Sequence, residues 1–227
     1  MRNLKDTLAF DVYGTLIDTS GVFATLEKMI GVQAEDFMGS WRSKQLEYSF
    51  RRGMMHQYVD FSKCTKDALE FCVRSYQVDF STEQKDELLQ IYRVLPAFPD
   101  VEECLQVVKN AGYRTFAFSN GSHAAVSQLL TNAKLLNYFE GVVSVENTAM
   151  FKPSPLVYAH FNKTSQSSAS DSWLISGNTF DVVGAMAYGM NSVWVRRSEN
   201  TIFDVGWEQP TATVPSLADL ITVLEQT

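Results

Sequence analysis

TLAFDVYGTLID, residues 7–18, sets the pattern that the rest of the chain follows. Its apolar residues lead into Asp11 and then into a turn at Gly14, which is typical of a buried strand that runs out into a loop. Open α/β sheets bind ligands beside the carboxyl ends of their strands, so Asp11 would lie where a ligand binds. The alternative is that Asp11 only caps the helix that follows. This stretch alone does not separate the two interpretations.

Composition favours an ordinary soluble globular protein. The chain has 227 residues, 45% hydrophobic and 20% charged, enough for one large domain or for one domain with a sizeable insertion. The net charge of -7 argues against nucleic acid or an anionic membrane as a partner. No apolar run reaches membrane-spanning length, and residues 1–10 lack the apolar core of a signal peptide.

The cysteines and histidines argue against a zinc site or a disulfide framework. Cys64, Cys72 and Cys104 are odd in number and lie in helical-looking stretches, so we expect buried free thiols in a reducing compartment. We therefore predict a cytoplasmic protein. There is no CxxC or HExxH motif, and the three histidines are scattered.

The first half of the chain reads as helix. The pattern is helical from Gly21 to about Gln77, with breaks expected near Gly31 and Gly53, and Ser81 with Gln84 resembles a capping box that opens a helix through about Leu95. The segment PAFP, residues 96–99, then ends the helical run.

Helices and short apolar strands alternate after residue 99. The strands are expected at 113–119, 141–145, 172–176 and 191–196, and the helices at 100–111, 122–134, 154–162, 180–188 and 216–225. Such alternation predicts a parallel sheet covered on both faces. The first strand is followed by about 80 helical residues, far more than a parallel crossover needs. We predict an α/β, Rossmann-like core of residues 1–16 and 97–227 with an inserted all-helical cap of residues 17–96.

Polar residues follow four of the predicted strands. The groups concerned are Asp11, Ser119-Asn120, Lys152, and Ser176-Gly177-Asn178 with Asp181 close behind. Each alone has an ordinary explanation, as a helix cap, a solvated loop residue or a charge in a first helical turn. In a parallel sheet, however, all these strand ends lie at one edge. Their coincidence favours an active site.

These motifs resemble a known superfamily. DVYGT, SNG, KP and SGNTFD are similar to the four signature motifs of the haloacid dehalogenase superfamily, in order and across the whole chain. Together with WRSKQLEYS at 41–49 and FKPSPLVY at 151–158, they resemble the L-2-haloacid dehalogenases in particular. The phosphatases of the superfamily have acidic residues where this chain has Tyr13 and Ser176. Because Mg²⁺ is usually anchored by more than one carboxylate, we expect chemistry without metal or cofactor.

The resemblance implies a displacement at carbon. Asp11 would attack the halogen-bearing carbon of a 2-haloalkanoate, expel halide and form an ester with inversion. Arg42 would receive the halide, with Asn120 and Phe180. The substrate carboxylate would be held by Ser119 and by backbone N–H groups after Asp11, including those of Val12 and Tyr13. For Arg42, the ordinary alternative is a surface arginine on a helix.

The remaining assignments concern support and hydrolysis. Thr15 would orient the Asp11 carboxylate, and Lys152 would keep it ionised. Tyr158 would support this network by contacting Lys152 or Asp11, although a half-buried helix aromatic is nearly as plausible. Asp181 would activate the water that hydrolyses the ester. The positioning of that water is assigned to Ser176, Asn178 and Lys152, and the apolar pocket to Tyr13, Gln45, Leu46 and Phe61.

The sequence therefore predicts hydrolysis of short-chain L-2-haloalkanoic acids to D-2-hydroxyalkanoic acids and halide, by a homodimer that binds neither nucleic acid nor membrane. Two alternatives stay open. One is a magnesium-dependent phosphatase or phosphonatase on the same fold, and the other is a catalytically silent α/β binding module. A nucleotide-binding Rossmann domain is disfavoured because no GxGxxG follows the first strand.

Overall fold

A computed structural model describes residues 6–226 of the chain. The first five residues, on which the expectation of no signal peptide partly rests, lie outside the described residues. No helix between residues 6 and 226 is both long enough and apolar enough to cross a membrane.

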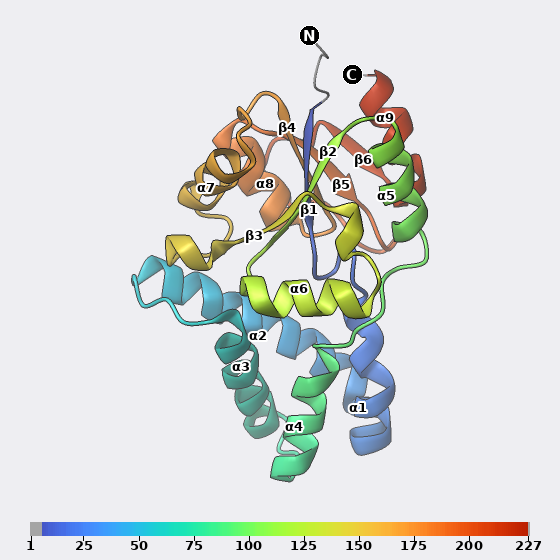
Figure 1. Ribbon diagram of the computed structural model, residues 1–227. Coiled ribbons are helices and arrows are strands. Elements are labelled where there is room, and N and C mark those ends of the chain that lie inside the picture. The colour runs from blue at the N-terminus through green and yellow to red at the C-terminus, as the bar shows by residue number, and fades with distance from the viewer. Residues whose placement is uncertain (1–5, 227) are drawn as a thin grey trace.

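A six-stranded parallel sheet forms the α/β part, as predicted (Figure 1). Its spatial order is β3-β2-β1-β4-β5-β6. The strands are β1 (Thr7–Asp11), β2 (Arg114–Ser119), β3 (Gly141–Ser144), β4 (Ser172–Ser176), β5 (Asn191–Val195) and β6 (Ala212–Val214). From β1 the chain adds β2 and β3 on one side of β1, and it then adds β4, β5 and β6 on the other side. The strand order therefore reverses between β1 and β4. Ligands of doubly wound sheets bind outside the carboxyl ends of the strands at such a reversal.

Both faces of the sheet are covered by helices. Leu8 and Phe10 of β1 belong to the cluster formed with α5 (Val101–Asn110), α6 (His123–Asn132) and α9 (Leu220–Gln226). Ala9 faces the second cluster, formed with α7 (Pro155–Ser165) and α8 (Thr179–Tyr188). Successive side chains of a strand point to opposite faces, which explains why a near-continuous apolar run feeds two separate cores.

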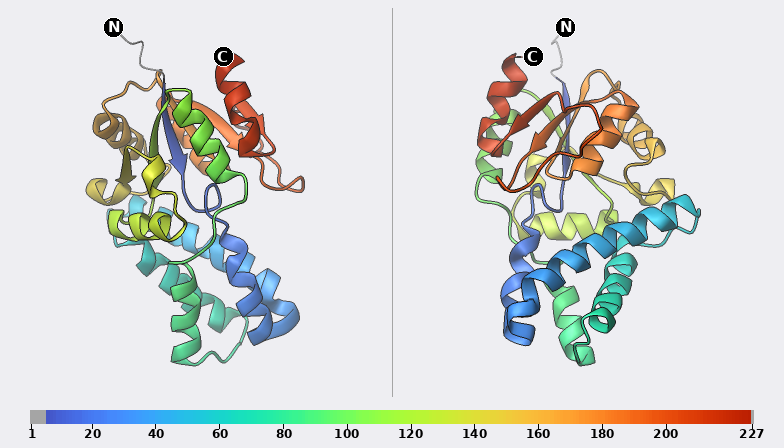
Figure 2. Two further views of the ribbon diagram at one scale, coloured as in Figure 1. Left: turned by 45° about the vertical axis from the view of Figure 1, so that its right-hand side comes forward. Right: turned by 180° about the vertical axis from the view of Figure 1, so that it is seen from behind.

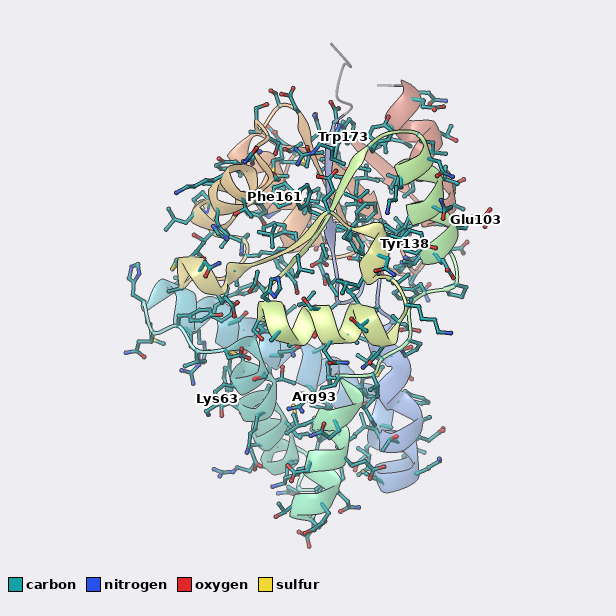
Figure 3. All side chains as sticks on the ribbon, viewed as in Figure 1. Lys63, Arg93, Glu103, Tyr138, Phe161 and Trp173 are labelled. Atoms are coloured by element: carbon teal, nitrogen blue, oxygen red, sulfur yellow. The ribbon has the colours of Figure 1, made fainter. Side chains whose placement is uncertain are left out.

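Four helices lie beyond the carboxyl ends of the strands (Figures 1 and 2). They are α1 (Phe23–Ile30), α2 (Ala34–Met54), α3 (Phe61–Ser75) and α4 (Thr82–Ile91), which we call the helical body. The predicted capping box of Ser81 and Gln84 is present at the start of α4. Trp41 is buried between α2 and α3, where its indole N–H donates to the Thr65 carbonyl at 2.9 Å. In Figure 3, Lys63 and Arg93 mark the helical body, and Trp173 marks the amino end of β4 on the far side of the sheet.

The chain passes between the sheet and the helical body through two adjacent segments. The Asp18 N–H donates to the Pro96 carbonyl at 2.8 Å, and the Phe98 N–H donates to the Leu16 carbonyl at 3.0 Å. Ile17 and Ala97 form an isolated antiparallel bridge between these hydrogen bonds. We call residues 16–18 and 96–98 the crossing segments.

The helix break predicted near Gly53 is confirmed, since α2 ends at Met54. Three other details of the predicted secondary structure were wrong. Strand β6 was not predicted; its three residues pair with β5 through tertiary contacts. The last helix begins at Leu220 because Ser216 caps a separate 3-10 turn, Leu217–Asp219. Helix α4 ends at Ile91, short of the predicted Leu95.

Candidate active site

Asp11 is the centre of the site, at the carboxyl end of β1 beside the reversal in strand order. Its side chain is only 9% exposed, and both carboxylate oxygens are held. Oδ2 accepts hydrogen bonds from Thr15 Oγ1 at 2.8 Å, Asn178 Nδ2 at 2.7 Å and Ser176 Oγ at 3.2 Å. Oδ1 accepts from Lys152 Nζ at 3.1 Å. The carboxylate is therefore fixed in one orientation by donors from three different segments.

The turn after β1 explains how Thr15 reaches Asp11. Gly14 adopts a φ of 80°, a backbone conformation that residues with a Cβ rarely adopt, and so reverses the chain. The predicted hydrogen bond from Thr15 to Asp11 is present, and Thr15 Oγ1 also accepts from the Gly177 N–H at 2.8 Å. Thr15 thus joins the loop after β1 to the loop after β4.

Lys152 lies between the two buried carboxylates. Its Nζ is 2.6 Å from Asp181 Oδ2 and 3.1 Å from Asp11 Oδ1, and it also donates to the Phe118 carbonyl at 2.9 Å. The lysine side chain is 1% exposed. Burial alone would lower the pKa of Lys152, but the two carboxylates outweigh it and the net shift is upward. The ammonium group is therefore charged at neutral pH.

Asp181 is fully buried and held from two sides. Burial is the largest effect and raises its pKa to about 6, although Lys152 and the hydrogen bond from Tyr158 act in the opposite direction. The Tyr158 hydroxyl donates to Asp181 Oδ1 at 2.8 Å and lies 3.1 Å from the Asp181 carbonyl. Tyr158 therefore supports the network through a hydrogen bond to Asp181, a different partner from Lys152 or Asp11, which were predicted. Tyr158 stands on α7 and Asp181 on α8, so the packing of these helices decides the partner.

Arg42 reaches the site from helix α2 of the helical body. Its Nη2 donates to Asn178 Oδ1 at 3.3 Å, and Asn178 in turn donates to Asp11. Its Nη1 donates to Gln45 Oε1 at 2.8 Å, and the Gln45 amide group donates to Thr65. Arg42 is not the surface arginine of the alternative interpretation. Gln45, which was predicted to line the pocket, is buried and connects Arg42 to Thr65 within the helical body.

The side-chain oxygens of Ser119 and Asn120 each accept a hydrogen bond from a backbone N–H group. Ser119 Oγ accepts from the Gly121 N–H at 3.1 Å, and Asn120 Oδ1 accepts from the Lys152 backbone N–H at 2.9 Å. Within residues 6–226, neither the Ser119 hydroxyl nor the Asn120 NH₂ group donates a hydrogen bond to another residue. These donors are available to an anionic ligand.

The other residues predicted to surround the substrate are partly or completely buried. Tyr13 is half-buried, with burial raising its pKa to about 12, and Phe180 packs edge-on against Phe50 of α2 with ring centroids 5.2 Å apart. Val12 is completely buried in the main core, so its side chain is directed away from the site and only its backbone could contact a substrate. Phe61 packs on Phe151 in the second core cluster, and Leu46 lies against that cluster.

Tyr92 belongs to this region but was not predicted. It follows α4, its ring packs against Trp41 at a centroid distance of 5.1 Å, and burial raises its pKa to about 12 while the charge of Arg42 lowers it. Burial lowers the pKa of Arg42 and raises that of Tyr13, and the Tyr92 phenol acts upward on both pKa values. No motif surrounds Tyr92 in the sequence, so only its ring contact with Trp41 of α2 reveals it.

The donor set does not suit a metal ion. Within residues 6–226, no group of three or more His, Cys, Asp and Glu side chains could hold one. The two carboxylates that meet in the site already share a lysine ammonium group.

A buried aspartate at the end of the first strand, a lysine between two carboxylates and an inserted helical body define a class of hydrolases. A family model for haloacid dehalogenase-like hydrolases matches residues 8–195, and the chain belongs to this family. The resemblance predicted from the motifs is thereby confirmed. The α/β core with parallel sheet is likewise shared with solved dehalogenase structures.

Individual relatives narrow the similarity to the 2-haloacid dehalogenases. The (S)-2-haloacid dehalogenase 4A of Burkholderia cepacia is 34% identical over 191 residues, covering 84% of this chain and 83% of that protein. The haloacetate dehalogenase H-2 of Moraxella sp. (strain B) is 31% identical over 219 residues, covering 96% and 97%. The L-2-haloacid dehalogenase from Xanthobacter autotrophicus, solved with chloropropionic acid covalently bound, matches with a TM-score of 0.90 and 28% identity, over 97% of this chain and 98% of the other.

Proposed function

We propose that the protein hydrolyses short-chain L-2-haloalkanoic acids to D-2-hydroxyalkanoic acids and halide through a covalent ester on Asp11. The observation that carries this proposal is the Asp11 carboxylate, which is buried, oriented by Thr15, Ser176 and Asn178, and paired with Lys152. A carboxylate held in this way is a positioned nucleophile. The relative from Xanthobacter autotrophicus, with its covalently bound chloropropionic acid, supports the same chemistry.

In the first step, an Asp11 oxygen attacks the carbon that bears the halogen. The new C–O bond forms as the carbon–halogen bond breaks, and the halide leaves with the bonding electron pair, inverting the centre. Arg42 would stabilise this growing negative charge, with the Asn120 amide and the Phe180 ring edge beside it. Ser119 and the backbone N–H groups after Asp11 would hold the substrate carboxylate.

In the second step, water attacks the carbonyl carbon of the Asp11 ester. Asp181 would take the proton of this water, with Ser176, Asn178 and Lys152 around it. The bond from this carbon to the substrate oxygen then breaks, the oxygen takes up the proton that Asp181 received from the water, and the 2-hydroxy acid leaves with the Asp11 carboxylate restored. The charge of Asp11 is one of the causes that raise the pKa of Asp181. Esterification removes that charge, so the pKa of Asp181 falls just when the residue is needed as a base. Lys152 supplies positive charge throughout, which is the basis for proposing a reaction without metal or cofactor.

The helical body would act as a cap. We propose that residues 17–96 form a cap domain on a core of residues 1–16 and 97–227, since Arg42 extends from α2 to Asn178 at the ends of the strands. A closed cap excludes water from the first step. We further propose a homodimer, supported by exposed apolar side chains of the helical body such as Val32, Met54 and Phe71, which sedimentation would test. The three buried free thiols support a cytoplasmic location.

The test is halide release from L-2-chloropropionate by wild type, Asp11→Asn and the control Asp171→Asn. Asp171 is an exposed carboxylate at the amino end of β4, away from the site. We expect Asp11→Asn to abolish release and Asp171→Asn to keep it. Single turnover in heavy-oxygen water should place the label in Asp11, because water attacks the ester carbonyl carbon. Retained turnover in Asp11→Asn, or label appearing directly in the hydroxy acid, would refute the mechanism.

The alternatives predict other outcomes of the same panel. A phosphatase would hydrolyse p-nitrophenyl phosphate with Mg²⁺ and lose activity in chelator, whereas we expect halide release to persist in chelator. A catalytically silent binding module would release no halide from any L- or D-2-haloacid or from fluoroacetate.

A further inference from the structure

A second mostly buried ion pair lies directly beside the nucleophile loop. Arg197 follows β5, and its Nη1 is 2.6 Å from Asp100 Oδ2, with each side chain 17% exposed. The same Asp100 oxygen accepts from Ser216 Oγ at 2.7 Å and from the Leu217 N–H at 2.8 Å. Asp100 is therefore anchored to the segment that follows β6, and it fixes one side of the Arg197 guanidinium.

The other side of the guanidinium holds the loop that carries the nucleophile. Arg197 Nη2 donates to the Thr15 carbonyl at 2.6 Å, and the Thr15 hydroxyl donates to Asp11 Oδ2 at 2.8 Å. Only one residue therefore separates Arg197 from the carboxylate proposed to attack the substrate. A guanidinium group suits this task, because its planar fork can bind a carboxylate and a carbonyl at once, which a single ammonium group does with less fixed geometry.

Arg197 also contacts one of the two crossing segments. Its guanidinium carbon lies 4.1 Å from the centroid of the Phe98 ring, within the range of a cation–π interaction. The Phe98 N–H donates to the Leu16 carbonyl, next to Thr15 in the chain. Arg197 thus contacts Phe98 of one crossing segment and Thr15, the residue directly before the other.

We propose that Arg197 is a positioning residue for the dehalogenation reaction, which fixes Asp11 through Thr15 and ties that position to the crossing segments. This inference rests on the proposed function for its effect on rate. Because reactions of this kind require the attacking atom within a few tenths of an ångström of its productive position, loosening Thr15 should slow esterification of Asp11. Substrate affinity should change little, since Arg197 contacts none of the groups proposed to hold substrate.

The chain offers a closely matched control in Arg114. Its Nη1 donates to the Ser165 carbonyl at 2.7 Å, its Nη2 pairs with Glu140 at 3.0 Å, and its guanidinium lies 5.2 Å from the centroid of the Phe116 ring. Arg114 begins β2, at the end of the sheet opposite Asp11. Arg114→Met therefore removes the same kinds of interaction from a place where the nucleophile is not held.

The kinetic experiment measures steady-state kcat and KM and single-turnover halide release. It compares wild type, Arg197→Met, Arg197→Lys and Arg114→Met. Thermal unfolding shows that each variant is folded. We expect Arg197→Met to lower kcat on the order of 100-fold with little change in KM, Arg197→Lys to be intermediate, and Arg114→Met to keep the wild-type kcat. In a further variant, Arg197→Ala, free guanidinium at non-denaturing concentration should restore part of the rate. An unchanged kcat in Arg197→Met, or an equal loss in Arg114→Met, would overturn the proposal.

A second measurement does not depend on activity. Hydrogen exchange of the Phe98 and Gly177 amides reports on the crossing segments and on the Thr15 hydroxyl, respectively. We expect Arg197→Met to accelerate exchange at both amides and Arg114→Met to accelerate neither. Unchanged exchange in Arg197→Met would refute the positioning role. By contrast, a wild-type protein that releases no halide would refute the proposed function, and the exchange data would still decide whether Arg197 holds this loop.

Discussion

Replacing Lys152 with methionine would leave two buried carboxylates without the cation that they share. Lys152 Nζ lies 2.6 Å from Asp181 and 3.1 Å from Asp11, and its side chain is almost completely buried. Removing one partner of a buried ion pair costs about 3–5 kcal/mol, because the charge left behind is neither solvated nor paired. We expect Lys152→Met to lower the free energy of unfolding by about this amount at neutral pH. Methionine has a similar shape, so a cavity adds little.

The loss should depend on pH in a definite direction. The pKa of Asp181 in the folded protein is already about 6, and removing the lysine charge that lowers it would raise it further. A carboxyl group whose folded pKa lies above its unfolded value of about 3.9 binds more protons in the folded state between those two values, so stability falls as pH rises through that range. In the variant this fall continues to higher pH than in wild type. The deficit should therefore change little below about pH 6 and grow above it by about 1.4 kcal/mol per pH unit, until the pKa of Asp181 in the variant is reached.

Urea unfolding across this pH range, together with halide release, tests the argument. Without the Lys152 ammonium group beside Asp11 and Asp181, we expect halide release to fall on the order of 100-fold or more. The control is Lys163→Met, an exposed lysine on α7, which should change neither quantity. A stability deficit of equal size at about pH 5 and about pH 8, or halide release within about tenfold of wild type, would refute the reasoning.

Two further predictions concern the groups around Asp181. Tyr158→Phe removes a hydrogen bond that lowers the pKa of Asp181, so the acid limb of the pH–rate profile for ester hydrolysis should move above about pH 6; a limb that stays in place contradicts this role. Gly184→Ala would place a Cβ against the Tyr158 hydroxyl and 2.5 Å from Pro153 Cβ, and should cost about 1–3 kcal/mol in thermal unfolding. Gly39→Ala, with open space around it on α2, should instead gain about 0.5–1 kcal/mol, so a gain at both positions or a loss at both contradicts the packing argument.

The sheet could be predicted because local signals agree with tertiary structure there. Five strands are apolar runs bounded by turn residues, and each lies within two residues of its predicted limits. The segment Ala212–Val214 has no such signal, and only its pairing with β5 makes it a strand. The break near Gly53, by contrast, was predictable, since α2 ends at Met54.

The site could be predicted only as far as strand ends and family motifs reach. Asp11, Lys152 and Asp181 meet because parallel strands bring their loops to one edge. The partner of Tyr158 depends on how α7 packs on α8, and the position of Tyr92 depends on its contact with Trp41 of α2. Neither contact is encoded locally. Arg197 could have been found from the sequence, because it lies just past the end of β5. Polar residues that follow predicted strands are candidates for the site, and Arg197 is such a residue.

The pairing of the two crossing segments makes the helical body separable from the sheet. Because residues 16–18 and 96–98 lie side by side and are joined by hydrogen bonds, the insertion begins and ends at nearly the same point in space. The closure entropy of a segment attached in this way grows only slowly with its length. We expect insertions from relatives to be exchangeable at these boundaries without rearranging the strands, provided that each insertion supplies an arginine at the place of Arg42.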